Sequence, residues 1–302
     1  MKIPRVSIYA LILLSFAAAA GYGYFKIERI LDDAALLRRR DVATLAAAVL
    51  EERFERLEDL GSSLSTRVRF GELVERRRWQ DAIKILRSVP TSFPFIDRVL
   101  LTDDEGTLVA HVPALPGVIG KNFAFHDWYR ATRATGKPTI SEVYRRQALP
   151  RYDVVAVALP VRGNSGAVRG ILVLQVRAST VFDWIEAVFA DTDVNLEIVD
   201  QKGHLVALQH PSNRGDRPNV DELPKADAAG SVAVPLPRYG WSVVARQSAI
   251  PPVRRHALEV LLSIYATLLL LTLALARALV RAFEALESSE AELARVRGHA
   301  SS

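Results

Sequence analysis

The apolar residues of the chain are concentrated first in two long runs, one near each end. The run Val6–Phe25 carries no charged residue, and the run Ala257–Ala276 carries only Glu259, near its start. A helix of about 20 residues rises about 30 Å, the thickness of the hydrocarbon core of a bilayer. We therefore predict transmembrane helices over 6–25 and 257–276. Small residues at 17–21 are also typical of a signal-peptide cleavage site, but the run is long and a helical pattern continues beyond it, which favours an uncleaved anchor.

A helical pattern follows the first run, with neither Gly nor Pro between Lys26 and Leu60. Apolar positions spaced alternately four and three residues apart lie on one face of a helix, and here they are Leu50, Phe54, Leu57, Gly61, Leu64 and Val68. A second, short helix is expected over Glu72–Leu86. We interpret 26–90 as stalk and packing helices whose apolar face lies on a sheet, and a stalk of this length favours a homodimer in addition.

Runs of β-branched and apolar residues, separated by turns that contain Gly, then predict strands. The expected strands are Ile96–Thr102, Thr107–Val112, Val154–Val161, Val168–Val176, Val194–Val199, His204–Leu208, Ser231–Leu236 and Trp241–Arg246. The first hairpin, VLLTDDEGTLVAHVP, recurs as LEIVDQKGHLVALQHP, with an acidic turn closed by Gly in both copies. This internal repeat predicts two modules, a larger one over 91–190 and a smaller one over 191–252.

One stretch stands apart from this regular pattern. Between the strand pairs of the first module lies Asn122–Asp153, NFAFHDWYRATRATGKPTISEVYRRQALPRYD, which is dense in aromatic and cationic side chains. It predicts a short helix, a Gly-Lys-Pro turn, a strand and a basic loop. We expect the specific binding site of the protein here.

The charge of the chain narrows the classes of partner. The net charge of +5 and a pI near 9.5 suit an anionic partner. No Lys/Arg run is interleaved with stacking aromatics, so lipid headgroups or an acidic small ligand are expected and nucleic acid is not. There is no cysteine, which excludes disulfides and thiolate sites. Neither a His-rich metal motif nor a cofactor motif is present. The Gly163–Gly166 segment is a turn and no nucleophile elbow, because no helix follows it, so we do not expect an enzyme.

The flanking charges predict how the chain is oriented. Lys2 and Arg5 precede the first apolar run, and Arg277 and Arg281 follow the second. By the positive-inside tendency, residues 1–5 and the tail 277–302 are cytoplasmic. Residues of about 26–256 are then periplasmic, on a protein that crosses a bacterial inner membrane twice. The near-heptad spacing of apolar residues in the tail predicts a coiled-coil helix.

The combination of these modules resembles the double Cache family of extracytoplasmic sensor domains, over roughly residues 26–252. The residues that carry the resemblance are DRVLLTDDEGTLVAH, HDWYRATRATGKPTISEVYRR, VVAVALPVRGNSGAVRGILVLQV and the closing GWSVVA. The resemblance implies two PAS-like sheets in an α+β fold with a ligand pocket in the membrane-distal module. It also implies membership of receptors such as histidine kinases, chemoreceptors and diguanylate cyclases.

Part of the site pattern of the amino-acid-binding branch of that family is present. Trp128, Tyr129 and Tyr144 match it, whereas His126 stands where the family has Arg and Arg146 stands where it has Asp. The resemblance therefore implies a retained aromatic frame with an altered specificity.

Two groups of residues complete the candidate site. Aromatic residues at a helix start are more often core than ligand contacts, but the match raises Trp128 and Tyr129 to candidates. Arg146 and Arg151 are either a solvated basic cluster or the groups that grip a carboxylate or phosphate, and Asp153 either pairs with one of them or lines the site.

Together, these observations predict a transmembrane sensor that binds a small anion in its distal module and relays the signal through the second membrane helix. A tethered binding module without output is the alternative. Because no output domain fits after Leu293, a sensor of this kind needs a separate kinase, cyclase or regulator, or is the sensory portion of a longer receptor.

Overall fold

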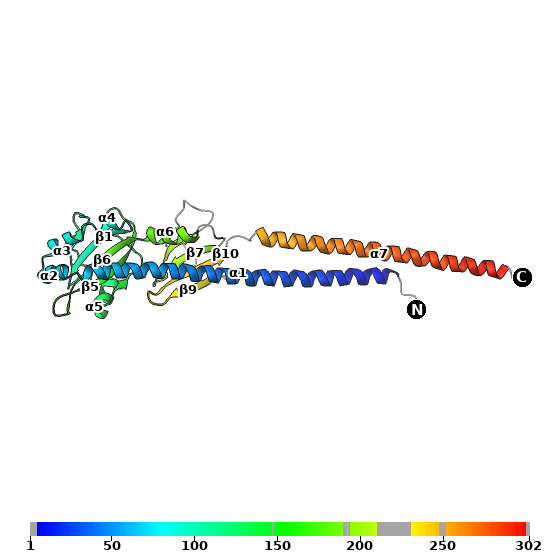
Figure 1. Cartoon of the computed structure of the whole chain (residues 1–302), viewed down its shortest axis with the longest axis horizontal. Coiled ribbons are helices and arrows are strands. Elements are labelled where there is room, and N and C mark those ends of the chain that lie inside the picture. Colours follow the sequence, from blue (N-terminus) through cyan, green and yellow to red (C-terminus); the bar gives the residue numbers. More distant parts are fainter. Residues whose placement is uncertain are drawn as a thin grey trace. The chain divides into compact units, whose positions relative to one another are not determined.

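The computed structural model describes residues 5–146, 148–189, 192, 194–209, 231–247 and 252–299. Two compact units are present: Leu36–Ser248, and a second unit made of Met1–Ala35 with Ala249–Ser302. The helices and strands, labelled in Figure 1, are α1 (Arg5–Ser65), α2 (Val68–Glu75), α3 (Trp79–Ile85), α4 (Val89–Ser92), β1 (Ile96–Asp103), β2 (Leu108–Val112), α5 (Asp127–Thr135), β3 (Thr139–Ile140), β4 (Tyr144–Arg145), β5 (Asp153–Arg162), β6 (Val168–Arg177), α6 (Ala178–Phe189), β7 (Val194–Val199), β8 (Leu205–Gln209), β9 (Val232–Leu236), β10 (Trp241–Gln247) and α7 (Pro252–His299).

The fold class predicted from the sequence is confirmed. The first sheet has the strand order β2-β1-β6-β5-β3, with β4 paired to β5, and the second has the order β8-β7-β10-β9. All the strand pairs in the described residues are antiparallel. Residues 210–230, between β8 and β9, lie outside the described residues.

The helices divide the first sheet into two differently covered faces. Alternate residues of β5 point to opposite sides, and Val155, Val157 and Leu159 pack with α1 to α4 in the main hydrophobic core. Ala156 and Ala158 face the other way, into a second, smaller core under α5. The main core continues from α1 onto the second sheet, so α1 runs along both sheets (Figure 1).

The apolar face predicted for α1 is the face that packs. Leu50, Phe54, Leu57 and Leu64 are buried in the main core. Val68 is not part of that face, because α1 ends at Ser65 and Val68 begins α2 with 78 % of its surface exposed. The single helix predicted over 72–86 is also wrong: the chain breaks at Arg77, which has φ 55°, and forms α2 and α3.

The sequence repeat corresponds to two hairpins with the same turn. In the first, one carboxylate oxygen of Asp103 accepts from the backbone N–H groups of Glu105 (3.0 Å) and Thr107 (2.8 Å). In the second, one oxygen of Asp200 accepts from those of Lys202 and His204, both at 2.9 Å. The acidic residue of each repeat therefore organises its own turn.

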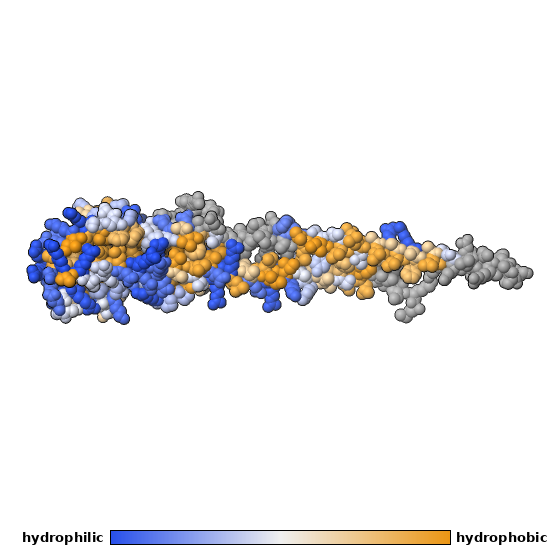
Figure 2. All heavy atoms as spheres, in the orientation of Figure 1, coloured by the Kyte–Doolittle hydropathy of each residue, from blue (hydrophilic) through white to orange (hydrophobic). Residues whose placement is uncertain are grey.

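Two helices are long and apolar enough, by length and composition, to cross a membrane. They are α1, in its N-terminal part, and α7, over Glu259–Leu286. Large apolar side chains such as Leu14 and Leu270 are exposed on them, and apolar residues (orange in Figure 2) predominate there. Because water would penalise such a surface, these segments suit a lipid environment.

Gly61 allows α1 to approach β5 closely, and its replacement tests this contact. A Cβ atom at position 61 would lie 2.4 Å from Leu159 Cδ1. We expect Gly61→Ala to lower the free energy of unfolding by about 1–2 kcal/mol, because the clash outweighs the higher helix propensity of Ala. Denaturant unfolding followed by tryptophan fluorescence measures this change.

Gly71→Ala is the matched control in α2, because its added Cβ would meet the Arg162 carbonyl oxygen at an ordinary 3.4 Å. We expect it to leave the stability unchanged or raise it by up to about 1 kcal/mol. Equal effects of the two substitutions would contradict the close approach of α1 to the sheet.

Candidate functional site

The strand register identifies the residues that lie beneath α5. Residues directly opposite one another in neighbouring strands share a face. The resulting rows across β1, β6 and β5 are Arg98–Gln175–Ala156 and Leu100–Val173–Ala158. Trp128 and Tyr129 of α5 pack in the same core as Leu100, Ala156, Ala158 and Val173. We call this side of the first sheet the α5 face.

An aromatic cluster lies over the α5 face, centred on His126. The imidazole is stacked with Trp128 (ring centroids 5.5 Å apart, planes at 19°) and with Phe123 (5.6 Å, 20°). It is tilted against Tyr144, with the centroids 4.8 Å apart. Three of the aromatic candidates from the sequence are thus brought together.

His126 contributes an uncharged ring to this cluster. It occupies the N-cap position of α5 but its side chain makes no capping hydrogen bond. Burial lowers the pKa of His126, and nearby Glu142 and Asp127 oppose this only partly. Because the ordinary histidine pKa already lies below 7, the ring is neutral at physiological pH.

Trp128 and Tyr129 are both buried but have different surroundings. Trp128 retains 1 % of its surface, and its indole N–H, although near the Tyr144 hydroxyl, does not reach hydrogen-bond geometry. Tyr129 donates its hydroxyl to the carbonyl of Asp104 at 2.8 Å, which fastens α5 to the β1–β2 turn. Trp128 therefore has an unused donor, whereas Tyr129 has a structural contact.

Tyr144 connects the aromatic cluster to the sheet. Its hydroxyl accepts a hydrogen bond of 3.4 Å from Gln175 Nε2. Burial raises the pKa of Tyr144 to about 12, against the hydrogen bond from Gln175, which lowers it. The phenol therefore stays protonated and is a neutral donor.

Arg146 lies in a closed network of its own. Its Nη1 donates to Asp97 Oδ2 at 3.0 Å and also to the Tyr152 hydroxyl, while Nε and Nη2 donate to the carbonyls of Ala148 and Leu149. Only 6 % of its side chain is exposed. Four of the five guanidinium N–H donors are thus engaged within the protein, so the residue expected to grip an anion holds β1 to the loop after β4.

Asp97 is the anion at the centre of that network. Burial raises its pKa, but hydrogen bonds from Tyr152 and Arg177, with the charges of Arg177 and Arg146, outweigh burial and lower the pKa overall. Asp153 instead contacts exposed Arg145 at 3.3 Å, and Arg151 is exposed. Asp153 therefore has an ion-pair partner outside the aromatic cluster.

Several side chains around the α5 face have a buried polar atom without a hydrogen-bond partner in the described residues. These atoms are Arg98 Nε, Thr102 Oγ1, His111 Nδ1, Trp128 Nε1, Thr132 Oγ1, Glu142 Oε2 and Gln175 Oε1. An unpaired buried polar group costs about 1–3 kcal/mol, so such a concentration is expected where something else supplies partners. Sequence reasoning missed most of these residues, although Gln175 interrupts the apolar run ILVLQV.

The unpaired ring nitrogen of His111 can be identified as a donor. Its Nε2 lies 2.7 Å from the backbone N–H of Leu115 and 3.1 Å from the Leu115 carbonyl. Because an N–H donor at the shorter distance requires an acceptor, we assign the imidazole proton to Nδ1. His111, which lies opposite Leu100 on the α5 face, therefore has an unpaired N–H donor at Nδ1. Burial together with the charge of Arg98 lowers its pKa.

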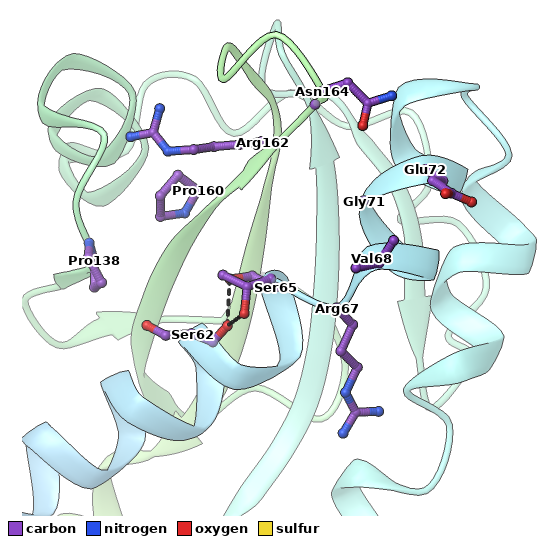
Figure 3. A pocket seen from close by; sticks show the side chains of 12 residues that line it. Ser62, Ser65, Arg67, Val68, Gly71, Glu72, Pro138, Pro160, Arg162 and Asn164 are labelled. Atoms are coloured by element: carbon purple, nitrogen blue, oxygen red, sulfur yellow. Dashed lines mark hydrogen bonds between the residues drawn. The ribbon is translucent and has the colours of Figure 1, made fainter.

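An open pocket of about 340 Å³ lies elsewhere, where α1 gives way to α2 (Figure 3). Two of its polar side chains have partners: Ser65 Oγ donates to the Ser62 carbonyl, and Arg162 donates to the carbonyls of Gly166 and Gly136. The pocket thus lacks the unpaired buried atoms of the α5 face. Within the described ranges, no three His, Asp or Glu side chains are grouped to hold a metal ion.

No protein-family model and no curated protein matches the sequence. Solved structures do match. The ligand-binding domain of the Pseudomonas fluorescens chemoreceptor CtaA, in complex with L-isoleucine, is 13% identical with a TM-score of 0.55, over 74% of this chain and 96% of that one. That of the Pseudomonas aeruginosa amino acid chemoreceptor PctB, in complex with L-Arg, is 15% identical with a TM-score of 0.52, over 70% and 93%.

A third match agrees with these two. The ligand-binding domain of the Campylobacter jejuni chemoreceptor Tlp3, in complex with 4-methylisoleucine, is 12% identical with a TM-score of 0.51, over 72% of this chain and 92% of that one. The chain therefore has the double Cache fold of chemoreceptor ligand-binding domains. The resemblance seen in the sequence is confirmed at the level of the fold.

Proposed function

We propose that this protein is a membrane-anchored sensor whose larger, distal module (91–190) binds a small polar molecule between α5 and the first sheet. The observation that carries the proposal is the concentration of buried, unpaired polar atoms on the α5 face. The fold supports it, because the matching solved domains bind small ligands. The ligand-contacting residues that we propose are His126, Trp128, Tyr144 and Gln175.

The proposed ligand differs from the anion expected from the sequence. That expectation rested on Arg146 and Arg151. The guanidinium of Arg146 is engaged with Asp97 and backbone carbonyls, and Arg151 is exposed. The cluster itself consists of neutral rings and the neutral amide of Gln175. Neutral groups by themselves do not replace the hydration that a dissolved anion loses. A cation of the α5 face is Arg98, in the row of Gln175; its Nη1 donates to the Pro113 carbonyl, and its Nε has no hydrogen-bond partner in the described residues.

The proposed setting follows from the two apolar helices. The unit Leu36–Ser248 is joined to α1 and α7, and the flanking arginines favour a periplasmic position for 26–256 on a bacterial inner membrane. A ligand shifts the sensor only by its differential affinity for two arrangements. The helical residues beyond Arg277 would pass that shift to a separate cytoplasmic kinase, cyclase or regulator, in a homodimer.

A ligand screen on the full chain in lipid nanodiscs tests the proposal. We expect at least one of a panel of amino acids, amines and carboxylates to raise the unfolding temperature, as selective binding to the folded state requires. Trp128→Phe removes the unpaired N–H and keeps an aromatic ring, so it should weaken that ligand about tenfold, the effect of one lost hydrogen bond. Isothermal titration calorimetry measures the affinity.

Trp241→Phe is the matched control, since Trp241 lies in β10 of the other sheet with an equally buried and unpaired indole N–H. The Trp241→Phe variant should bind the ligand with the same affinity as the unsubstituted protein. A ligand that binds Trp128→Phe as tightly as the unsubstituted chain would place the binding site elsewhere.

A further inference from the structure

Glu142 occupies an irregular position at the edge of the proposed site. Ile140 lies opposite Val157, and Tyr144 lies opposite Val154. Four residue steps along the β3–β4 segment therefore meet three along β5, which is the mark of one inserted residue. Such insertions redirect a side chain out of the regular alternation and are frequent beside functional sites.

The bulge at Glu142 is held in place from the other module. Asp200, in the β7–β8 turn, accepts a hydrogen bond from the backbone N–H of Val143 through its second carboxylate oxygen at 3.0 Å. Lys202, in the same turn, contacts Glu142 Oε1 at 3.0 Å and Asp127 Oδ2 at 2.7 Å. The repeat turn of the smaller module thus fixes the position of Glu142.

The carboxylate of Glu142 is only half satisfied. The residue retains 6 % of its surface, and its Oε2 has no hydrogen-bond partner in the part of the chain that the structure describes. A buried carboxylate oxygen without a partner is costly. The cation that contacts Glu142 is Lys202. It contacts Oε1 and not Oε2, and it is shared with Asp127.

Glu142 lies beside the aromatic cluster. Tyr144 follows it by two residues, and His126 adjoins Asp127, which shares Lys202 with Glu142. The negative charge of Glu142 acts on both neighbours, opposing the lowered pKa of His126 and adding to the raised pKa of Tyr144. Because burial keeps His126 neutral, its ring does not supply the missing positive charge.

The charged and polar groups at this corner define which ligand group fits. A carboxylate or phosphate would meet the charge of Glu142. A quaternary ammonium would be attracted to the rings but has no N–H, so Oε2 would stay unpaired. A primary or secondary ammonium satisfies both requirements, because it donates to the carboxylate and lies against aromatic faces.

We propose that Glu142 Oε2 is the acceptor for a protonated amine of the ligand, which lies against Trp128 and Tyr144. This inference rests on the proposed function and narrows its ligand to molecules with an N–H ammonium group. It also places the carboxylate of the site at 142, four residues before the position where the amino-acid-binding pattern has Asp and this chain has Arg146.

The test compares matched ligands on the full chain in nanodiscs. The panel contains the L-amino acids, their N-trimethylated counterparts, the corresponding acids without the amine and the corresponding amines without the carboxylate. We expect calorimetry to detect binding only for members with an N–H ammonium group. Trimethylation of a bound member should weaken it on the order of 10- to 100-fold, the range for a hydrogen bond to a charged group.

Protein variants give an independent readout. Glu142→Gln keeps the shape but removes the charge, and it should weaken the bound amine by the same 10- to 100-fold, with Glu142→Asp in between. Glu58→Gln is the matched control, because Glu58 is a buried carboxylate paired with Arg238 at α1 and leaves the α5 face untouched. Its affinity for the amine should be unchanged.

Each outcome decides a separate claim. Equal binding of an amine and its trimethylated counterpart, or unchanged affinity in Glu142→Gln, overturns the ammonium site while the proposed function stands. The ammonium site is also overturned, and the proposed function stands, when the only panel members that bind are acids without an amine and Trp128→Phe weakens their binding. Both proposals are overturned when no panel member binds, or when Trp128→Phe weakens the binding of none of them. The ligand comparison needs no variant, so a poorly folded Glu142→Gln does not block the test.

Discussion

Arg146→Ala should lower the free energy of unfolding by about 3 kcal/mol, a large part of the stability of an ordinary domain. The substitution leaves the buried Asp97 carboxylate with Arg177 and Tyr152 alone, and it removes the donors to two backbone carbonyls. Denaturant unfolding of the full chain measures the change. All four tryptophans lie within Leu36–Ser248, so their fluorescence reports the unfolding of that unit.

The neighbouring residue provides the control. Arg145 contacts Asp153 at 3.3 Å, but 65 % of its side chain is exposed, against 6 % for Arg146. Exposed ion pairs contribute about 0–1 kcal/mol, so Arg145→Ala should have little effect. Similar losses from both substitutions would contradict the buried network and return Arg146 to the set of candidate ligand contacts.

Phe54→Ala should cost about 3–5 kcal/mol, the range for removing a fully buried aromatic side chain. Phe54 joins α1 to the second sheet through edge-to-face contacts with Tyr239 (centroids 5.1 Å apart) and Trp241 (5.0 Å). Aromatic pairs in this arrangement add to the stability gained from burial. The same fluorescence experiment measures the loss, and Trp241 lies directly in the contact.

Leu45→Ala is the control on the same helix, because Leu45 is 60 % exposed. We expect a change within about 0.5 kcal/mol. If Phe54→Ala were equally mild, the smaller module would not be fastened to α1 at this point. Movement of that module would then have to reach the membrane by another route.

The two contacts have different consequences for a sensor. The Arg146 network holds β1 to the loop after β4 in the first sheet. The Phe54 contact connects the second sheet to α1, which contains the first apolar segment. Between them, Asp200 and Lys202 join the smaller module to the proposed site. Under the proposed function, these are the contacts through which an occupied α5 face would bias α1.

The sequence predicted those parts of the structure that follow from local patterns. Runs of β-branched and apolar residues between Gly-containing turns predicted the strands of both sheets, because these residue types favour extended backbone and Gly supplies the positive φ of the turns. The repeat could be recognised in the sequence because the Asp at each turn accepts hydrogen bonds from backbone N–H groups at most four residues further along the chain. The break at Arg77 was missed, because no Pro or Gly marks it.

The candidate site was predictable only in part. The aromatic residues His126, Trp128 and Tyr144 lie close together in the chain and meet in the structure. The partners of Arg146 were not predictable, because Asp97 is 49 residues away in the sequence. Glu142 was overlooked for a similar reason: its contact with Lys202 spans 60 residues.

By itself, then, the sequence determined two apolar spans, a long helix, two repeated sheet modules and the stretch Asn122–Asp153 in which the aromatic cluster lies. Periodicity and turn chemistry act over a few residues, so a single chain records them. The tertiary structure decided which charges are engaged and which are left unpaired. That outcome depends on residues brought together from distant strands, and it directs attention from the cation of Arg146 to the carboxylate of Glu142.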